Sequence, residues 1–307
     1  MSSSNIRFRG LLSAGLASLM LSVAHMPALR AASFELPPLN TPATTEHHVG
    51  KVVWAELVTP DLAAAERFYG GLFGWTFQAV HAGGSEYAVA LSGRRPVGGL
   101  FQKPIPAGES RQSAWLTFIS ARDVDGAKRA ALAHGATLVS DSRSYPARGR
   151  QAVLSDPQGA VFAILASSSG DSPDFLAEPG EWIWSSLLSH DPDAAAAFYQ
   201  HVFSYDVFDL ASDDGLEHVI LSSDDLARAS VNSLPVDSKR RHSHWLNFVR
   251  VEDTVGTAAR VVASGGRVLV DPHVDRHGGH VAVVADPAGA PFGLMEWTSG
   301  DSKAEPN

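Results

Sequence analysis

The sequence predicts an α+β protein of two tandem domains, each built from two βαβββ units that form an open, curved sheet. The first observation behind this prediction is an internal repeat, and the second is that strand and helix signals occur twice within each copy. Residues recur at an offset of 130 positions, as in Trp54 and Trp184, Phe68 and Phe198, Trp115 and Trp245, and Asp156 and Asp286. A fixed offset over such a length indicates a duplication with almost no insertions, so each copy is expected to be one structural unit.

The first unit of copy one begins with an alternating, Val- and Trp-rich segment at 51–58, which predicts a strand. Asp61 is placed to cap a helix that runs to Leu72, because apolar residues recur on one face, and Gly74 is expected to end it. Three short strands are then expected, at residues 76–80, 86–92 and 96–102.

The same order restarts after a loop rich in Pro and Gly. The second unit is expected to contain a strand at 115–120, a helix at 123–134 and strands near 137–139, 150–155 and 161–166. Copy two repeats both units, so the chain is predicted to hold four of them.

Residues 1–30 are expected to be a signal peptide rather than part of the fold. Arg7 and Arg9 form a basic start, and residues 11–23 are mainly apolar but too short to cross a bilayer. Ser22-Val23-Ala24 is a small-x-small cleavage site, and the alternative is a short buried helix. We therefore expect an exported protein, periplasmic or extracellular, with no stable membrane anchor after cleavage.

The remaining chain divides by composition. We expect an exposed linker at 31–50, a second linker at 167–180 that separates the copies, domains at 51–166 and 181–298, and a disordered tail at 299–307. The chain has no cysteine, so neither a disulfide framework nor a lipid-anchored Cys is available.

The charge of the chain bears on its partners. The net charge is −9, and removing residues 1–30 with their three arginines takes it to −12. An acidic surface repels phosphate backbones, so nucleic acid is excluded as a partner and a small-molecule ligand is expected.

Several short motifs occur in a fixed order. They are Thr59-Pro60-Asp61, Phe68-Tyr69-x-x-Leu72-Phe73-Gly74-Trp75 and Asp156-Pro157-x-Gly159-x-x-Phe162, and most of these positions repeat in copy two. Together they resemble the vicinal oxygen chelate superfamily, which includes glyoxalase I, bleomycin-resistance proteins and extradiol dioxygenases. The resemblance implies two tandem glyoxalase-like domains, and it suggests a monomer in which one copy packs on the other as an internal pseudo-dimer.

The resemblance also implies where a metal would bind. Enzymes of the superfamily hold a metal with His, Gln or Glu side chains on the first and last strands of each unit. Here the matching places are occupied by Trp54, Trp115 and Ala163 in copy one and by Trp184, Trp245 and Gly293 in copy two. These side chains offer no lone pair suited to a divalent metal, so no cofactor is expected.

The four tryptophans predict a different kind of site. Because strand side chains alternate between faces, we expect the tryptophans to line the concave faces of the sheets, with Leu116 and Phe118 under the helices. The residues expected to bind a ligand are Trp54, Trp115, Thr117, Trp184, Ser186, Trp245 and Asn247. Indoles with a few polar groups suit a flat, apolar or aromatic molecule. The alternative is that the tryptophans are plain core packing.

Glu56 is the candidate catalytic residue. It is expected beside Trp54 in the cavity, where burial would raise its pKa and suit it to general acid–base chemistry. A carboxylate held by backbone donors or by a nearby arginine is the alternative.

Histidines are concentrated in copy two. His273, His277 and His280 form a second, less favoured candidate, a divalent-metal site in a loop, the alternative being solvated histidines. The loop at the matching place in copy one carries Arg143, Arg148 and Arg150, which could attract an anionic ligand, although a solvated basic loop is the favoured interpretation. Two functions therefore remain open: an exported protein that binds a small apolar or aromatic molecule without the usual metal, or a lyase, isomerase or dioxygenase that uses Glu56 or the histidines.

Overall fold

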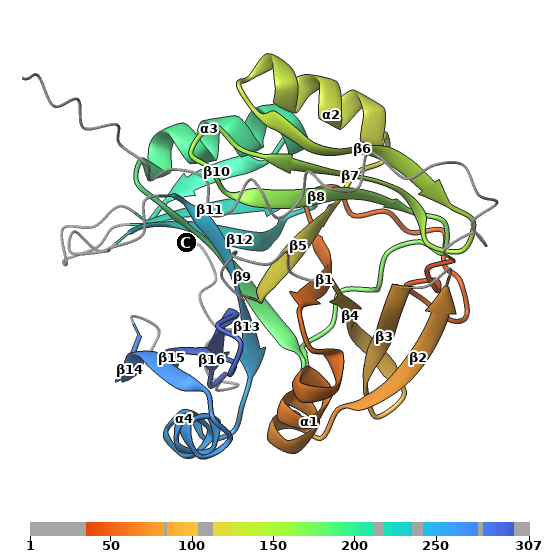
Figure 1. Ribbon diagram of the computed structural model, residues 1–307. Coiled ribbons are helices and arrows are strands. Elements are labelled where there is room, and N and C mark those ends of the chain that lie inside the picture. The colour runs from red at the N-terminus through yellow and green to blue at the C-terminus, as the bar shows by residue number, and fades with distance from the viewer. Residues whose placement is uncertain are drawn as a thin grey trace, which may run out of the picture.

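The structure is a computed structural model that describes residues 35–82, 85–103, 113–210, 218–234, 242–275 and 279–297 (Figure 1). The expected signal peptide, the C-terminal tail and His277 lie outside the described residues. Among the residues described, no helix is both long enough and apolar enough to cross a membrane.

Copy one forms one open sheet of eight strands with two helices. Its elements are β1 (Val52–Thr59), α1 (Leu62–Phe73), β2 (Thr76–Ala82), β3 (Ser85–Ser92), β4 (Arg95–Gln102), β5 (Ala114–Ser120), α2 (Val124–Ala133), β6 (Thr137–Tyr145), β7 (Gly149–Ser155) and β8 (Val161–Ser167). The strand order is β2-β3-β4-β1-β5-β8-β7-β6, so the first strands of the two units are neighbours at the centre.

Copy two repeats this sheet. Its elements are β9 (Trp182–Ser189), α3 (Pro192–Phe203), β10 (Asp206–Asp209), β11 (His218–Ser223), β12 (Leu226–Ser233), β13 (His244–Arg250), α4 (Thr254–Ala263), β14 (Arg267–Val274), β15 (His280–Ala285) and β16 (Pro291–Met295). The order β10-β11-β12-β9-β13-β16-β15-β14 matches that of copy one. The predicted fold, with four βαβββ units in two open sheets, is confirmed.

The helix ends follow the predicted signals. The Asp61 side chain accepts a hydrogen bond from the Ala64 backbone N–H (2.9 Å) and so caps α1. Gly74 ends α1 in the left-handed region (φ 72°), which glycine adopts at little cost.

The repeat shifts by one residue at one place. Glu56 pairs with Gly99, whereas its counterpart Ser186 pairs with Ser230, so β12 follows β4 at an offset of 131 rather than 130. The offset returns to 130 at β5 and β13.

The two copies share their hydrophobic cores. One core joins α2 and its strands to α3 and its strands, and the other joins α1 to the α4 side of copy two. Figure 1 shows α2 beside α3 and α1 beside α4. We call the side of each sheet that meets the helices its helix face and the opposite side its inner face.

The two predicted linkers are not plain exposed linkers. Residues 35–44, which we call the strap, place Leu36 and Leu39 in a core cluster on the inner face of copy one, each 3% exposed. The second linker holds the strap, because Ser169 Oγ accepts hydrogen bonds from the backbone N–H groups of Leu39 (3.0 Å) and Asn40 (3.1 Å). The expected exposure therefore does not hold at Leu36 and Leu39, and Ser169 of the second linker is buried as well.

Candidate functional site

The alternation of side chains along β5 has the opposite phase to the one predicted. In the antiparallel pairing of β1 and β5, Trp54 lies opposite Phe118 and Leu57 lies opposite Trp115. Directly opposed residues share a face, so Trp54 shares the inner face with Phe118, while Trp115 lies on the helix face. Period-2 alternation puts Leu116 and Phe118 on one face of β5 and Trp115 and Thr117 on the other. It does not determine which of the two pairs faces the helix, because both pairs are suited to burial.

Trp115 and Trp245 are therefore not cavity residues. The indole N–H of Trp115 donates to the Tyr69 hydroxyl (2.9 Å), which donates to Asp286 of the other copy (3.2 Å). Copy two repeats this arrangement with Trp245, Tyr199 and Asp156, at 2.8 and 3.3 Å. We call these two Trp–Tyr–Asp chains the interface clamps, because each one joins the copies.

The carboxylates of the clamps are buried at the interface. Burial raises the pKa of Asp286 above its ordinary range, against the opposing effect of hydrogen bonds from the backbone and from Tyr69. Burial likewise raises the pKa of Asp156. The Asp-Pro-x-Gly motifs thus have a structural role in holding the two copies together.

Thr117 and Asn247 meet between the two sheets. Thr117 Oγ1 lies 3.1 Å from Asn247 Oδ1, which also accepts from Ser185 Oγ at 2.8 Å. Thr117 is fully buried at this contact and not in a cavity on the inner face, contrary to the prediction. Asn247 also borders a cleft, and its Nδ2 has no hydrogen-bond partner among the described residues.

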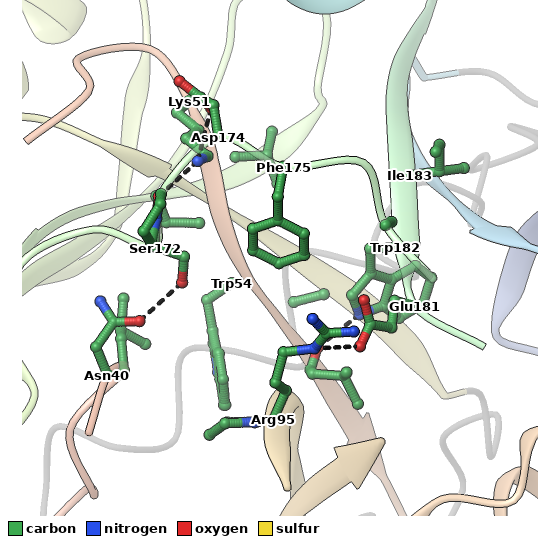
Figure 2. Close-up of a pocket in the computed structure, with 18 of the residues that line it drawn as sticks. Asn40, Lys51, Trp54, Arg95, Ser172, Asp174, Phe175, Glu181, Trp182 and Ile183 are labelled. Atoms are coloured by element: carbon green, nitrogen blue, oxygen red, sulfur yellow. Dashed lines mark hydrogen bonds and ion pairs between the residues drawn. The ribbon is translucent and has the colours of Figure 1, made fainter. Parts of the chain in front are cut away.

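This cleft between the copies has a volume of about 630 Å³. Its walls come from the starts of β1, β4, β9 and β12, the strap and the second linker. Figure 2 shows the side chains of Trp54, Arg95, Phe175 and Trp182 around it. Three indoles line it, those of Trp54, Trp182 and Trp184, together with the ring of Phe175. Flat aromatic walls around a partly polar floor are typical of small-molecule sites.

The cleft is more basic than the rest of this acidic chain. Its lining includes four cations and two carboxylates, namely Lys51, Arg94, Arg95, Arg228, Asp174 and Glu181. The Asp174 carboxylate forms ion pairs with Lys51 and Arg228, both at 2.7 Å, and Arg95 forms an ion pair with Glu181 at 2.8 Å. Burial alone would raise the pKa of Asp174, but its two cationic partners outweigh this and lower it. These ion pairs hold the linker and the turns in place around the indoles.

On the inner face of copy two, Trp184 and Ser186 belong to a neutral hydrogen-bond network. Trp184 Nε1 donates to Ser230 Oγ (3.0 Å), which lies 2.8 Å from Ser186 Oγ. Asn232 continues the network, donating to Ser230 Oγ at 3.1 Å and contacting His218 Nδ1 at 2.8 Å. Ser186 is buried in this network and does not line the cleft.

On the inner face of copy one, Glu56 is partly buried. Its carboxylate accepts a hydrogen bond from the Tyr87 hydroxyl (3.1 Å). Gly99 makes this possible, because a Cβ at Gly99 would overlap that hydroxyl. Burial raises the pKa of Glu56, while attraction to Arg148 and the hydrogen bond from Tyr87 act against the rise. Glu56 thus has the raised pKa that was expected, but the strap covers its face of the sheet.

The residues at the expected metal positions do not fit a divalent metal. Glu56 is a single carboxylate on the face that carries Trp54, Phe118 and Ala163, and the charge that lowers its pKa is that of the cation Arg148. Across the described ranges, no group of three or more His, Cys, Asp or Glu side chains could hold a metal ion.

The histidine alternative is not supported by the pairing of β14 and β15. His273 pairs with Val281 and His280 with Val274, so the two histidines point to opposite faces of the hairpin. His280 is instead paired with Glu296 (3.0 Å), and His273 contacts the Asp271 carbonyl (2.9 Å).

Three important residues were not among the predicted site residues. Trp182 precedes Trp184 by two positions in β9, but a register shift between them places Trp182 against the helix-face cluster, so the spacing did not reveal that both indoles border the cleft. Tyr87 and Arg148 come from segments distant in sequence from Glu56, and no local pattern marks them. Arg148, expected in a solvated loop, is completely buried.

Two open eight-stranded sheets of this order define a tandem protein of the vicinal oxygen chelate fold. The family model described as a glyoxalase-like domain matches residues 52–165 and 186–295, so the chain belongs to the glyoxalase-like domain family.

Related proteins span most of the chain. CFP32 of Mycobacterium tuberculosis, named as a candidate glyoxylase, is 29% identical over 257 residues, which cover 83% of this chain and 98% of that protein. The anthracycline biosynthesis protein DnrV of Streptomyces peucetius is 29% identical over 82% of this chain and 94% of its own. Among solved structures, the Mn(II)-bound glyoxalase from Novosphingobium aromaticivorans shares the fold, with a TM-score of 0.56 and 17% identity over 81% of this chain and 83% of its own.

Proposed function

We propose that this protein binds a flat aromatic molecule with an oxygen acceptor in the cleft between its two copies, without the metal site usual in the superfamily. The observation that carries the proposal is the meeting of the indoles of Trp54, Trp182 and Trp184 with the unpaired Nδ2 of Asn247 in one cleft. The indoles provide stacking surfaces, and a ligand oxygen would accept a hydrogen bond from the buried amide.

The aromatic character of the ligand has a second support. DnrV is named for the biosynthesis of anthracyclines, which are polycyclic aromatic molecules. A cleft of about 630 Å³ is within the usual range for small-molecule sites.

The experiment is a titration of the protein with 1,8-dihydroxyanthraquinone, followed by quenching of tryptophan fluorescence. We expect saturable binding that weakens by about tenfold or more in Trp182→Leu, because a central aromatic anchor is lost. Trp297→Leu is the matched control, since Trp297 does not line the cleft, and its affinity should equal that of the wild type. If Trp182→Leu bound the probe with the same affinity as the wild type, the cleft would not be the binding site.

The side chains at the superfamily's metal positions, which include no cluster of metal ligands among the described residues, support a site without a metal. The acidic net charge supports the proposal that nucleic acid is not a partner. The cores shared by the copies support a monomer that acts as its own pseudo-dimer. The enzymatic alternative depends on Glu56 or on the histidines of copy two, and neither Glu56 nor any described histidine lines the cleft.

Export is the remaining part of the proposal, and the basic start and short apolar stretch of residues 1–30 support it. We expect the mature protein to begin between His25 and Ser33. Intact-mass measurement of the periplasmic or secreted fraction tests this, and a protein that keeps Met1 in the cytoplasmic fraction would contradict it.

A further inference from the structure

The turn between β3 and β4 brings two adjacent arginines, Arg94 and Arg95, to the wall of the cleft between the copies. The pairing of the two strands places Arg94 in the turn itself and Arg95 at the first position of β4. At the matching places of copy two stand Asp225 and Leu226. The turn is therefore basic in copy one and acidic in copy two, so the two sides of the cleft differ in charge.

The second linker holds Arg95 in one orientation. Its Nε donates to Glu181 Oε1 (2.8 Å), and Glu181 is itself buried and fixed by a hydrogen bond from the backbone N–H of Glu178 (3.0 Å). The guanidinium carbon of Arg95 also lies 5.1 Å from the centre of the Phe175 ring, and Figure 2 shows this arrangement. The two terminal nitrogens of Arg95 form no hydrogen bond or ion pair with a described residue. The guanidinium is thus oriented in advance, with its outer pair of donors open.

The ion pairs around the cleft leave one cation without a counter-charge. Lys51 and Arg228 are balanced by two carboxylates, because Asp174 pairs with both and Asp224 pairs with Arg228 (3.3 Å). The pair made by the second linker is neutral as well. Arg94, which is exposed, forms no ion pair with any residue in the described part of the chain. An anionic group in the cleft would supply the missing counter-charge without breaking an existing pair.

We propose that the ligand of the cleft is an aromatic acid, whose carboxylate is bound by Arg94 and by the open nitrogens of Arg95. This inference rests on the proposed function, since it names the charge of the molecule that the indoles stack on. The fork of a guanidinium matches the two oxygens of a carboxylate, and hydrogen bonds between charged groups are the stronger kind. A neutral amide or hydroxyl would leave the charge of Arg94 unbalanced. In a chain with a net charge of −9, this basic turn also provides a local attraction for an acid.

The first measurement compares anthraquinone-2-carboxylate with anthraquinone-2-carboxamide, two probes with the same rings, by quenching of tryptophan fluorescence. We expect the carboxylate to bind about tenfold more tightly or better, the advantage of hydrogen bonds to a charged group over neutral ones. This advantage should shrink as salt is added, because the arginines are exposed enough to be screened. Equal affinities for the two probes would overturn the inference, and binding of 1,8-dihydroxyanthraquinone in the same assay would then leave the proposed function standing. If none of the three probes bound, both would be overturned.

The second measurement locates the carboxylate with variants. Arg94→Gln and Arg95→Lys should each remove most of the preference for the carboxylate and leave the affinity for the carboxamide unchanged. Arg95→Lys keeps a cation for Glu181 but lacks the fork, so it tests the bidentate contact separately from the charge.

Arg67→Gln is the matched control, because it removes the same charge from α1, outside the cleft, and should keep the full preference. Trp182→Leu should weaken both probes by the same factor, which separates stacking from the recognition of charge. A full preference in both Arg94→Gln and Arg95→Lys would overturn the inference. An equal loss in Arg67→Gln and Arg94→Gln would also overturn it, since the preference would then reflect the net charge of the chain.

Discussion

Trp245→Ala is expected to lower the free energy of unfolding by about 3–5 kcal/mol, the range measured for removal of a large buried aromatic side chain. The Trp245 indole is 6% exposed, packs edge-on against Tyr199 with ring centres 5.2 Å apart and donates to its hydroxyl. Urea unfolding of the two proteins measures the difference.

The same variant distinguishes an interface clamp from a ligand site. Trp245 does not line the cleft, so the affinity for 1,8-dihydroxyanthraquinone should be unchanged at temperatures where the variant is folded. If Trp245→Ala left stability within about 1 kcal/mol of the wild type, the clamp would not have the structural role assigned to it. Trp245→Phe should cost less, because it keeps most of the ring, and it provides a folded variant for the binding measurement.

The second expected result concerns the hydroxyls at the centre of the clamps. Tyr69→Phe and Tyr199→Phe should each lower the free energy of unfolding by about 1–3 kcal/mol, because each leaves a buried indole N–H and a buried carboxylate without their shared partner. The tyrosines belong to different core clusters, so the double variant should lose about the sum. A large coupling between them would show that the clamps are not independent.

The loss should also depend on pH. A carboxyl whose folded pKa is raised stabilises the fold fully below its unfolded pKa and loses that contribution as the pH rises through the folded value. Burial raises the pKa of Asp286, and the hydrogen bond from Tyr69 limits that rise. Tyr69→Phe should therefore raise the pKa of Asp286 further, so that the free energy of unfolding keeps falling up to a higher pH than in the wild type. The deficit relative to the wild type should therefore be larger near neutral pH than at about pH 4. A deficit independent of pH would contradict this account.

The fold could be predicted from the sequence because its signals are local and occur four times. Asp61 and Gly74 bound α1 as expected, and the strands fall within a few residues of their predicted places except β6, which extends to Tyr145. Glu56 was placed correctly beside Trp54 on the inner face, since both belong to one strand.

The site could be predicted only in part. The phase of β5 depends on its pairing with β1, and nothing within Trp115–Phe118 distinguishes the helix face from the inner face. The burial of Arg148 depends on the strap, whose Pro37 carbonyl it contacts across more than 100 residues of sequence. Contacts of that range leave no periodic trace in a single sequence. Because of the one-residue shift in β12, the residue that corresponds to Gly99 is Ser230, whereas a constant offset of 130 would indicate Ala229.

The sharing of cores between copies has a consequence for how the protein is made. Phe162 of copy one packs against Phe198 of copy two, with ring centres 6.1 Å apart, so neither core is complete until copy two has been synthesised. At ordinary translation rates the ribosome needs on the order of ten seconds for a segment of this length. During that interval α1 and α2 pack only on the strands of their own copy, and a nascent chain stopped within copy two leaves the copy-one part of each core exposed where copy two would cover it.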